Sequence, residues 1–204
     1  MRFFSYDNPV WRFVLRVGQI WWLHILWLVT SIPLVTIGAS TTALIYSCMK
    51  LQKEDGYPLE NFFRSFRENF LQATAIWLIY VGAGCLLGFG LVFWNQTDPS
   101  SIKLGWALVI ALAIPYVFSL LYVFAVQAKF VNKVKDTIHY AIILSVKYFR
   151  YTFQMLLLAA FMVYVNLNTI VWANFLTLTI GFGLAVYLCS FYYQKIFENY
   201  IPMN

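Results

Sequence analysis

The stretch Ser31-Ile32-Pro33-Leu34-Val35-Thr36-Ile37-Gly38-Ala39-Ser40-Thr41-Thr42 interrupts a long apolar run near the start of the chain. The run extends from Val17 to Met49 and contains no Asp, Glu, Lys or Arg. As one helix it would be about 50 Å long, beyond a bilayer core of about 30 Å, yet it is short of the roughly 40 residues that two full crossings need. Proline and glycine break helices, and Ser or Thr caps a new one. We therefore predict a short bent helical hairpin with a motif of six residues: Pro33, Thr36, Gly38, Ser40, Thr41 and Thr42.

The composition of the whole chain is that of a membrane protein. Of 204 residues, 62% are hydrophobic and 11% are charged, whereas soluble domains have about 45–50% and about 25%. The richness in aromatic residues excludes a disordered chain. Three cysteines, Cys48, Cys85 and Cys189, stand alone without the spacing of a disulfide framework or a zinc site. The net charge of +6 is better explained by basic cytoplasmic loops than by nucleic-acid binding, for which the sequence has no motif.

Three further apolar runs complete the expected fold. The runs 69–97 and 104–128 each suit one spanning helix, and the run 151–194 is long enough for two, with asparagines in its middle. Aromatic residues without period-2 alternation favour helices over a barrel. We expect one all-α multi-pass membrane domain over residues 1–204, a bundle of about six membrane helices with amphipathic cytoplasmic helices. The expected membrane segments are 14–32, 36–50, 70–94, 104–128, 151–168 and 173–194.

The distribution of Lys and Arg predicts the orientation of these segments. Basic residues gather before the first run, in the cytoplasmic loop expected at 51–69 and in the one expected at 129–150, and loops rich in Lys and Arg stay in the cytoplasm. Two cytoplasmic flanks require the first run to return, either by crossing the bilayer twice or as a re-entrant hairpin. Both termini are then expected in the cytoplasm.

Amphipathic segments occupy both basic loops. In residues 59–72, four phenylalanines share a narrow helical sector, whereas most of the charged residues lie elsewhere. Such a segment binds lipid headgroups or docks a protein partner, and the residues alone do not separate these roles. The residues predicted to contact a partner or lipid are Phe62, Phe63, Arg64, Phe66, Arg67, Asn69, Gln72, Lys133 and Lys135.

Chemistry-bearing residues are scarce within the membrane segments. All eight acidic residues lie in loops or termini, so a proton- or sodium-coupled carrier is disfavoured. His24 is the one ionisable exception, and we interpret it as a neutral histidine hydrogen-bonded near an interface or a helix contact. No hydrolase, metalloprotease or P-loop motif is present. We therefore expect no enzyme activity and no cofactor or metal, with any ATP-driven role supplied by a partner.

Glycines in the segment 70–94 indicate close helix packing. Gly84 and Gly88 form a G-x-x-x-G pair, a pattern that lets two membrane helices approach closely. Packing within the bundle is the simpler interpretation, and a seam for another subunit is the alternative.

Two blocks of the sequence resemble the YesL family of bacterial membrane proteins, a family of unknown function. The first is S-I-P-L-V-T-I-G-A-S-T-T-A-L at 31–44, and the second is F-F-R-S-F-R-E-N-F-L-Q at 62–72. The resemblance extends over nearly the whole chain, but the loop 129–150 fits less well. It implies a multi-pass protein of the cell membrane in Gram-positive bacteria, associated with oligosaccharide import by binding-protein-dependent ABC transporters. No family-wide catalytic residue carries over.

These observations favour an accessory or regulatory membrane subunit without catalysis. Its expected partners are membrane lipids and the permease and ATPase subunits of an ABC importer, with no nucleic acid and only indirect contact with sugar. The alternative is a small permease or channel that works alone and uses the 36–42 hairpin as a polar lining. A membrane sensor or lipid-interacting scaffold comes third.

Overall fold

The computed structural model of the chain describes residues 9–96, 99–167 and 171–200, and within these ranges the protein is all-helical, with no strand. The elements are α1 (Pro9–Thr30), the 3-10 turn η1 (Leu34–Thr36), α2 (Ile37–Gln52), α3 (Pro58–Asn95), α4 (Pro99–Lys129), α5 (Val134–Lys147), α6 (Phe149–Leu167), α7 (Val171–Leu176), the π-helical turn η2 (Thr177–Gly181) and α8 (Phe182–Tyr200).

Six helical stretches in the described ranges are long and apolar enough to cross a bilayer. They are Val10–Thr30, Leu34–Gln52, Pro58–Asn95, Leu104–Lys129, Phe149–Leu167 and Asn174–Tyr200. This confirms the expected all-α membrane bundle. The turn expected between the last two segments falls partly on residues 168–170, which lie outside the described ranges.

The first apolar run folds as two helices joined by a bend. Helix α1 ends at Thr30, and Pro33 adopts an extended conformation that cannot continue the helix. After the single turn η1, the chain reverses into α2. The bend therefore lies where Pro33 and the residues around it predict a break.

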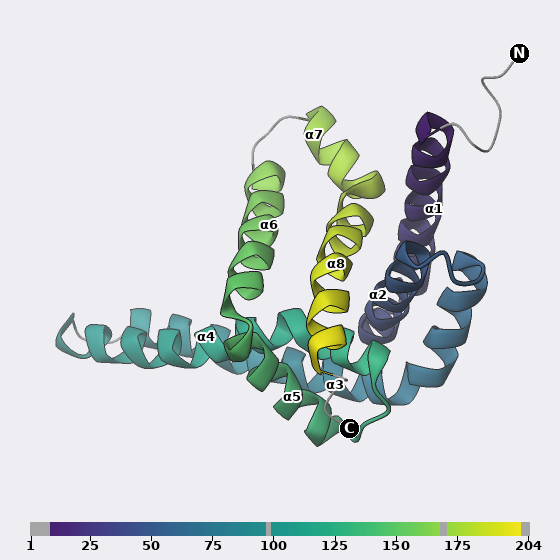
Figure 1. The fold of residues 1–204 in the computed structure, drawn as a ribbon. Helices are drawn as coiled ribbons and strands as arrows, with labels where there is room; N and C mark the ends of the chain where they lie inside the picture. The colour runs from purple at the N-terminus through teal and green to yellow at the C-terminus, as the bar shows by residue number, and fades with distance from the viewer. Residues whose placement is uncertain (1–8, 97–98, 168–170, 201–204) are drawn as a thin grey trace, which may run out of the picture.

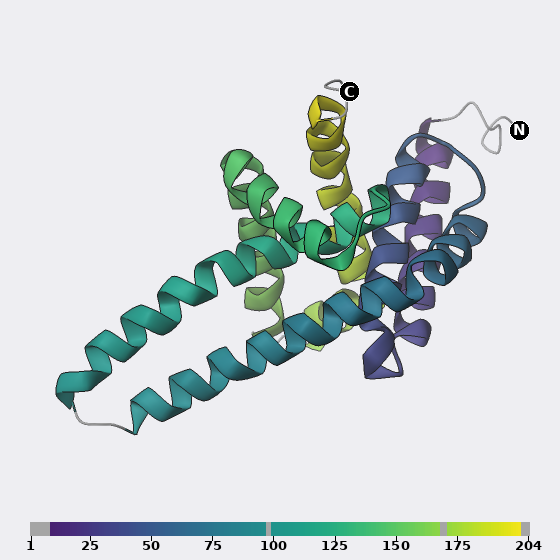
Figure 2. The same ribbon diagram turned by 90° about the horizontal axis from the view of Figure 1, so that it is seen from below.

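Helix α3 joins an amphipathic segment to a membrane span without interruption. Pro58 stands at its first turn, where a missing N–H costs nothing. The helix has 38 residues, about 57 Å of length. With α4 it forms a hairpin that projects sideways from the rest of the molecule (Figures 1 and 2).

The core of the protein lies around α2. Helices α1, α3, α4 and α8 all pack against it, and many of its fully buried side chains are small, among them Ala39, Ala43 and Cys48. Small side chains let neighbouring backbones approach closely, which is how membrane helices gain packing contacts. This explains how a helix of only 16 residues contacts four others.

Two ion pairs gather three parts of the chain at one end of the molecule. Arg16 of α1 contacts Glu54 at 2.8 Å, and Lys53 contacts Glu198 of α8 at 3.1 Å. The beginning of α1, the α2–α3 loop and the end of α8 thus lie together, while the bend after α1 lies at the opposite end (Figure 2). This arrangement fits a first run that returns to the side on which it began.

Candidate functional site

Hydrogen bonds hold the bend of the hairpin motif. The Thr36 hydroxyl donates toward the carbonyl oxygens of Thr30 (2.6 Å) and Pro33 (2.7 Å). The indole N–H of Trp77, on α3, donates to the carbonyl of Leu34 at 2.9 Å. Pro33 itself is exposed. The bend is therefore tied both to the end of α1 and to α3.

Gly38 permits a close approach between α2 and α3. A Cβ atom at this position would lie 2.4 Å from the carbonyl oxygen of Ala73 and 2.6 Å from the Cβ of Trp77. Backbone atoms cannot yield as a side chain can, so no larger residue fits without moving a helix. The glycine of the motif thus has a packing role.

The remaining hydroxyls of the motif are bonded within the protein. Ser40 and Thr42 are fully buried and donate to the carbonyls of Thr36 and Gly38, at 3.0 and 2.8 Å. Thr41 accepts the indole N–H of Trp27 at 3.1 Å. These bonds leave the motif with little polar surface to offer a solute.

An apolar cavity of about 450 Å³ lies at the centre of the bundle, and we call it the apolar cavity. Thr41 and Trp27 line it, but its other walls are almost entirely hydrocarbon and aromatic side chains from α2, α3, α4, α6 and α8. The Tyr193 hydroxyl on its wall donates to the carbonyl of Leu121 at 2.6 Å. A cavity with satisfied polar groups suits an apolar ligand better than a sugar.

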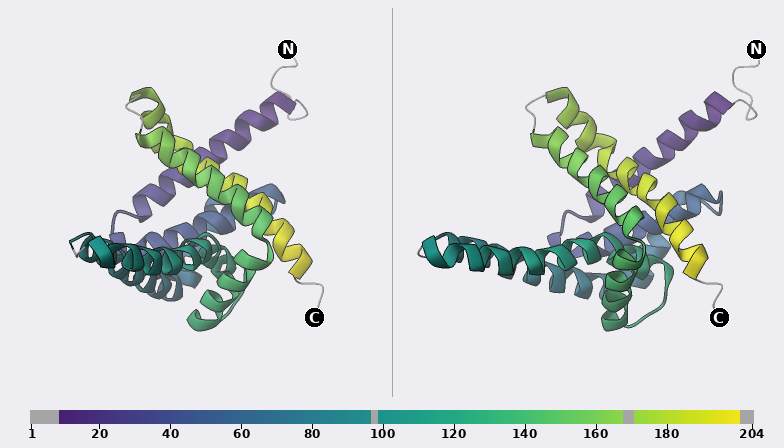
Figure 3. Two further views of the ribbon diagram at one scale, coloured as in Figure 1. Left: turned by 90° about the vertical axis from the view of Figure 1, so that its left-hand side faces the viewer. Right: turned by 60° about the vertical axis from the view of Figure 1, so that its left-hand side comes forward.

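His24 joins α1 to α8. The backbone N–H of Gly183 donates to its Nδ1 at 3.1 Å, so the ring proton sits on Nε2, 2.9 Å from the carbonyl oxygen of Leu178. A Cβ atom at Gly183 would lie 2.8 Å from the Cβ of His24, which marks a close crossing of the two helices. Figure 3 shows this crossing. The side chain is buried and its bonds are those of a neutral histidine at a helix contact.

Residues 59–72 in the first part of α3, which we call the phenylalanine segment, are divided between core and surface. Phe62 is fully buried, whereas the neighbouring Phe63 is 43% exposed. Phe66 is partly buried against the core. Arg64 pairs with Glu60 one helical turn away at 2.8 Å, and Arg67 is exposed. Phe62, predicted to contact a partner or lipid, therefore packs inside the protein because this edge of α3 faces the core.

Asn69 and Gln72 belong to a polar cluster that joins three helices. The side-chain amide of Gln127, on α4, donates to Asn69 Oδ1 and to Gln72 Oε1, each at 2.9 Å. Thr137 of α5 donates to Gln127 Oε1 at 3.3 Å. Gln127 and Thr137 were not among the predicted site residues. The only signal for Gln127 was an amide at the end of an otherwise apolar run.

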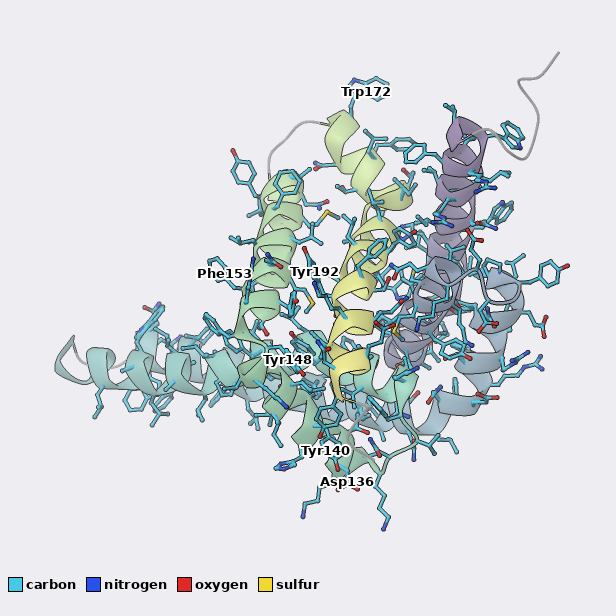
Figure 4. All side chains as sticks on the ribbon, in the orientation of Figure 1. Asp136, Tyr140, Tyr148, Phe153, Trp172 and Tyr192 are labelled. Atoms are coloured by element: carbon cyan, nitrogen blue, oxygen red, sulfur yellow. The ribbon has the colours of Figure 1, made fainter. Side chains whose placement is uncertain are left out.

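Lys133 and Lys135 lie at the start of α5, and both are exposed. Lys133 is the extended residue that precedes the helix. Figure 4 shows Asp136 and Tyr140 of the same helix at the opposite end of the view from Trp172 on α7. Because Lys133 and Lys135 are both exposed, they are available to a lipid or a partner.

Three other lysines converge on a pocket that the sequence did not reveal. Lys50, Lys53 and Lys129 line a cavity of about 150 Å³ with Glu198 and the aromatic rings of Tyr46 and Phe197; we call it the lysine pocket. Lys50 donates a hydrogen bond to Asp55, which holds the pKa of that carboxyl below its ordinary value. Gln194 and Met49 also line the pocket, and the Gln194 side chain donates to the carbonyl of Met49 at 2.7 Å, which fixes α8 against α2.

The glycines of α3 face two different environments. A Cβ atom at Gly84 would lie 2.8 Å from the hydroxyl of Tyr116, and one at Gly90 would lie 3.2 Å from Val109, so both pack against α4. In the described part of the chain, a Cβ atom at Gly82 or Gly88 would meet nothing within 4 Å beyond the adjacent backbone of α3. Within the protein, Gly84 and Gly90 therefore serve helix packing, whereas Gly82 and Gly88 do not.

Comparison with known proteins finds one similarity. The comparisons with curated proteins and with solved structures give no match. The matching family model covers the second half of α1, the bend, α2 and most of α3, and it therefore includes the hairpin motif and the phenylalanine segment. Over residues 20–91 the chain is similar to a protein family described as "Protein of unknown function, DUF624".

Proposed function

We propose that the protein is a YesL-like accessory or regulatory subunit of the bacterial cell membrane, without catalytic activity, which associates with a binding-protein-dependent ABC importer for oligosaccharides. Both termini and the lysine pocket then face the cytoplasm. The proposal rests on the resemblance in the bend and the phenylalanine segment, and on one structural observation, the unpartnered face of α3.

The observation that carries the proposal is a continuous apolar ridge on α3. It consists of Leu71, Leu78, Gly82, Leu86 and Phe89, which recur at intervals of three, four and seven residues and so lie along one helix face. The four large residues are 81%, 52%, 73% and 69% exposed in chain order. Gly82 opens a notch in the ridge, and a small residue flanked by large ones is the usual contact of one membrane helix with another.

The polar groups of the hairpin favour this role over a permease that works alone. A sugar pathway needs hydrogen-bonding groups that face the solute. In the described structure the hydroxyls of Thr36, Ser40 and Thr42 donate to backbone carbonyls, and Thr41 accepts from Trp27. The motif is therefore better suited to fixing the bend than to lining a pore.

Purification from its host in a mild detergent tests the proposal. We expect the tagged protein to co-elute with permease and ATPase subunits in a fixed ratio. In liposomes that contain only this protein, we expect no uptake of radiolabelled oligosaccharide. A homo-oligomer that elutes alone and transports sugar would contradict the proposal and support the permease alternative.

A further inference from the structure

The lysine pocket and the apolar cavity follow one another along the same helices. On α2, Ile45 lines the apolar cavity and Met49, one turn later, lines the lysine pocket. On α8, Tyr193 and Phe197 have the same relation. One helical turn is about 5.4 Å, so the two sites lie about one turn apart along both helices.

The charge of the lysine pocket and the hydrocarbon walls of the apolar cavity are together complementary to a molecule with an anionic head and an apolar tail. Three lysines and one acidic residue, Glu198, are among the residues that line the lysine pocket, which leaves an excess of positive charge. Lys129 makes no ion pair among the described residues, whereas Lys50 and Lys53 pair with exposed acids. The apolar cavity has a volume within the ~300–1,000 Å³ range of ligand pockets. An anionic head and a hydrocarbon tail fit these surroundings.

The place of the lysines in the fold matches the headgroup region of a bilayer. Lys50 is in the last turn of α2, and Lys129 is the last residue of α4. Both helices are membrane spans, so their ends lie near an interface, where basic side chains attract anionic lipid. The apolar cavity lies deeper along the same spans.

We propose that the lysine pocket and the apolar cavity together bind one anionic glycerophospholipid, with its phosphate on Lys50, Lys53 and Lys129 and an acyl chain in the apolar cavity. The site is distinct from the exposed Lys133 and Lys135, and it does not depend on the proposed association with an importer. A lipid held between α2, α4 and α8 acts as a structural ligand of the bundle.

Titration of the delipidated full-length protein in detergent, followed by native mass spectrometry, tests this site. We expect one long-chain phosphatidylglycerol to bind per protein, in preference to phosphatidylcholine of the same chains. Inorganic phosphate is expected not to displace it, and dihexanoyl phosphatidylglycerol is expected to bind at least about tenfold more weakly, because it buries fewer methylene groups. Equal binding of the two long-chain lipids, or displacement by phosphate, would overturn the proposal.

Substitutions in each half of the site separate the head from the tail. Each ammonium near a headgroup contributes roughly fivefold to binding, so replacing Lys50, Lys53 and Lys129 with Gln should weaken it on the order of 100-fold. The triple Lys→Arg variant should retain binding. Ala185→Phe, which fills the apolar cavity, should weaken the long-chain lipid and leave the dihexanoyl lipid unchanged.

Two control variants distinguish binding at the proposed site from a loss of folding or a general effect of charge. Glu198→Gln removes the one acid that lines the lysine pocket, so it should strengthen binding. Lys135→Gln removes one positive charge outside the pocket, as each single Lys→Gln substitution does inside it, and should leave binding unchanged. If Lys135→Gln weakens binding as much as a single Lys→Gln substitution in the pocket does, or Glu198→Gln weakens it, the attraction is a general effect of charge and the proposed site is wrong.

Discussion

Arg16 in the second turn of α1 and Glu54 just beyond the end of α2 form an ion pair at 2.8 Å. The pair brings the start of the first helix to the end of the second. Reporter tags placed before residue 9 and at Asp55 should therefore report the same side of the membrane, which we expect to be the cytoplasm. Tags that report opposite sides would show that the first apolar run crosses only once.

Adding a single methyl group at Gly38 should strongly reduce the stability of the protein. Gly38→Ala places a Cβ atom 2.4 Å from the Ala73 carbonyl oxygen, and such overpacking costs about 1–3 kcal/mol. Gly38→Val should cost more. The measurement is thermal unfolding of the purified protein in detergent.

Gly82→Ala is the matched control for Gly38. Among the described residues, no atom beyond the adjacent backbone of α3 lies within 4 Å of a Cβ at Gly82, and Ala is favoured over Gly in a helix by about 0.5–1 kcal/mol. The two substitutions should therefore change the unfolding temperature in opposite directions. A similar loss of stability in both variants would mean that α2 and α3 are not packed as described.

Helix breaks and membrane spans can be predicted from the sequence because they depend on local residues. Which face of a helix is buried cannot, because it depends on which helices pack together. The bend follows from Pro33, which adopts an extended conformation just after α1, whereas Pro115 lies within α4 without ending it. The spans follow from apolar runs bounded by charge. Phe62 and Phe63 are adjacent in one amphipathic segment, so periodicity alone does not say which edge of α3 will be covered. The structure buries the first and exposes the second.

The candidate site likewise contains some residues that the sequence identifies and others that only the packing of the helices brings together. The Thr and Ser residues of the hairpin motif were identifiable as a cluster beside a helix break. The expected helix cap was wrong, because Ser40 and Thr42 lie inside α2 and donate to carbonyls one turn back. The lysine pocket was not identifiable, since Lys50 and Lys129 lie on helices far apart in sequence and only the packing of α2 with α4 and α8 brings them together. Gln127 was hidden for the same reason, because its partners lie on α3 and α5.

The polar cluster around Gln127 should stabilise the junction of α3, α4 and α5. Gln127→Ala leaves Asn69 and Gln72 without their donor, and interhelical hydrogen bonds in membrane proteins contribute about 0.6–1.7 kcal/mol. In a double-mutant cycle, Gln127→Ala and Asn69→Ala should be non-additive. Additive losses of stability would show that the two side chains do not interact.

His24 should be more important for stability than the other histidine. His24→Ala leaves the Gly183 N–H and the Leu178 carbonyl without this partner inside the bundle, at a cost of about 1–3 kcal/mol. His139→Ala, at an exposed position of α5, is the control and should change stability by less than about 0.5 kcal/mol. Equal unfolding temperatures for the two variants would contradict the described contact between α1 and α8.

The most direct test of the proposed function is the amount of ABC permease that co-purifies with variants of the α3 ridge. We predict that wild-type protein retains the permease in a fixed ratio and that Gly82→Ile, which fills the notch, loses most of it. Leu157→Ile, an exposed apolar change on α6, should retain it. If no permease co-purifies with wild type, or Gly82→Ile retains as much as wild type, the account of α3 as the docking helix of an accessory subunit is contradicted.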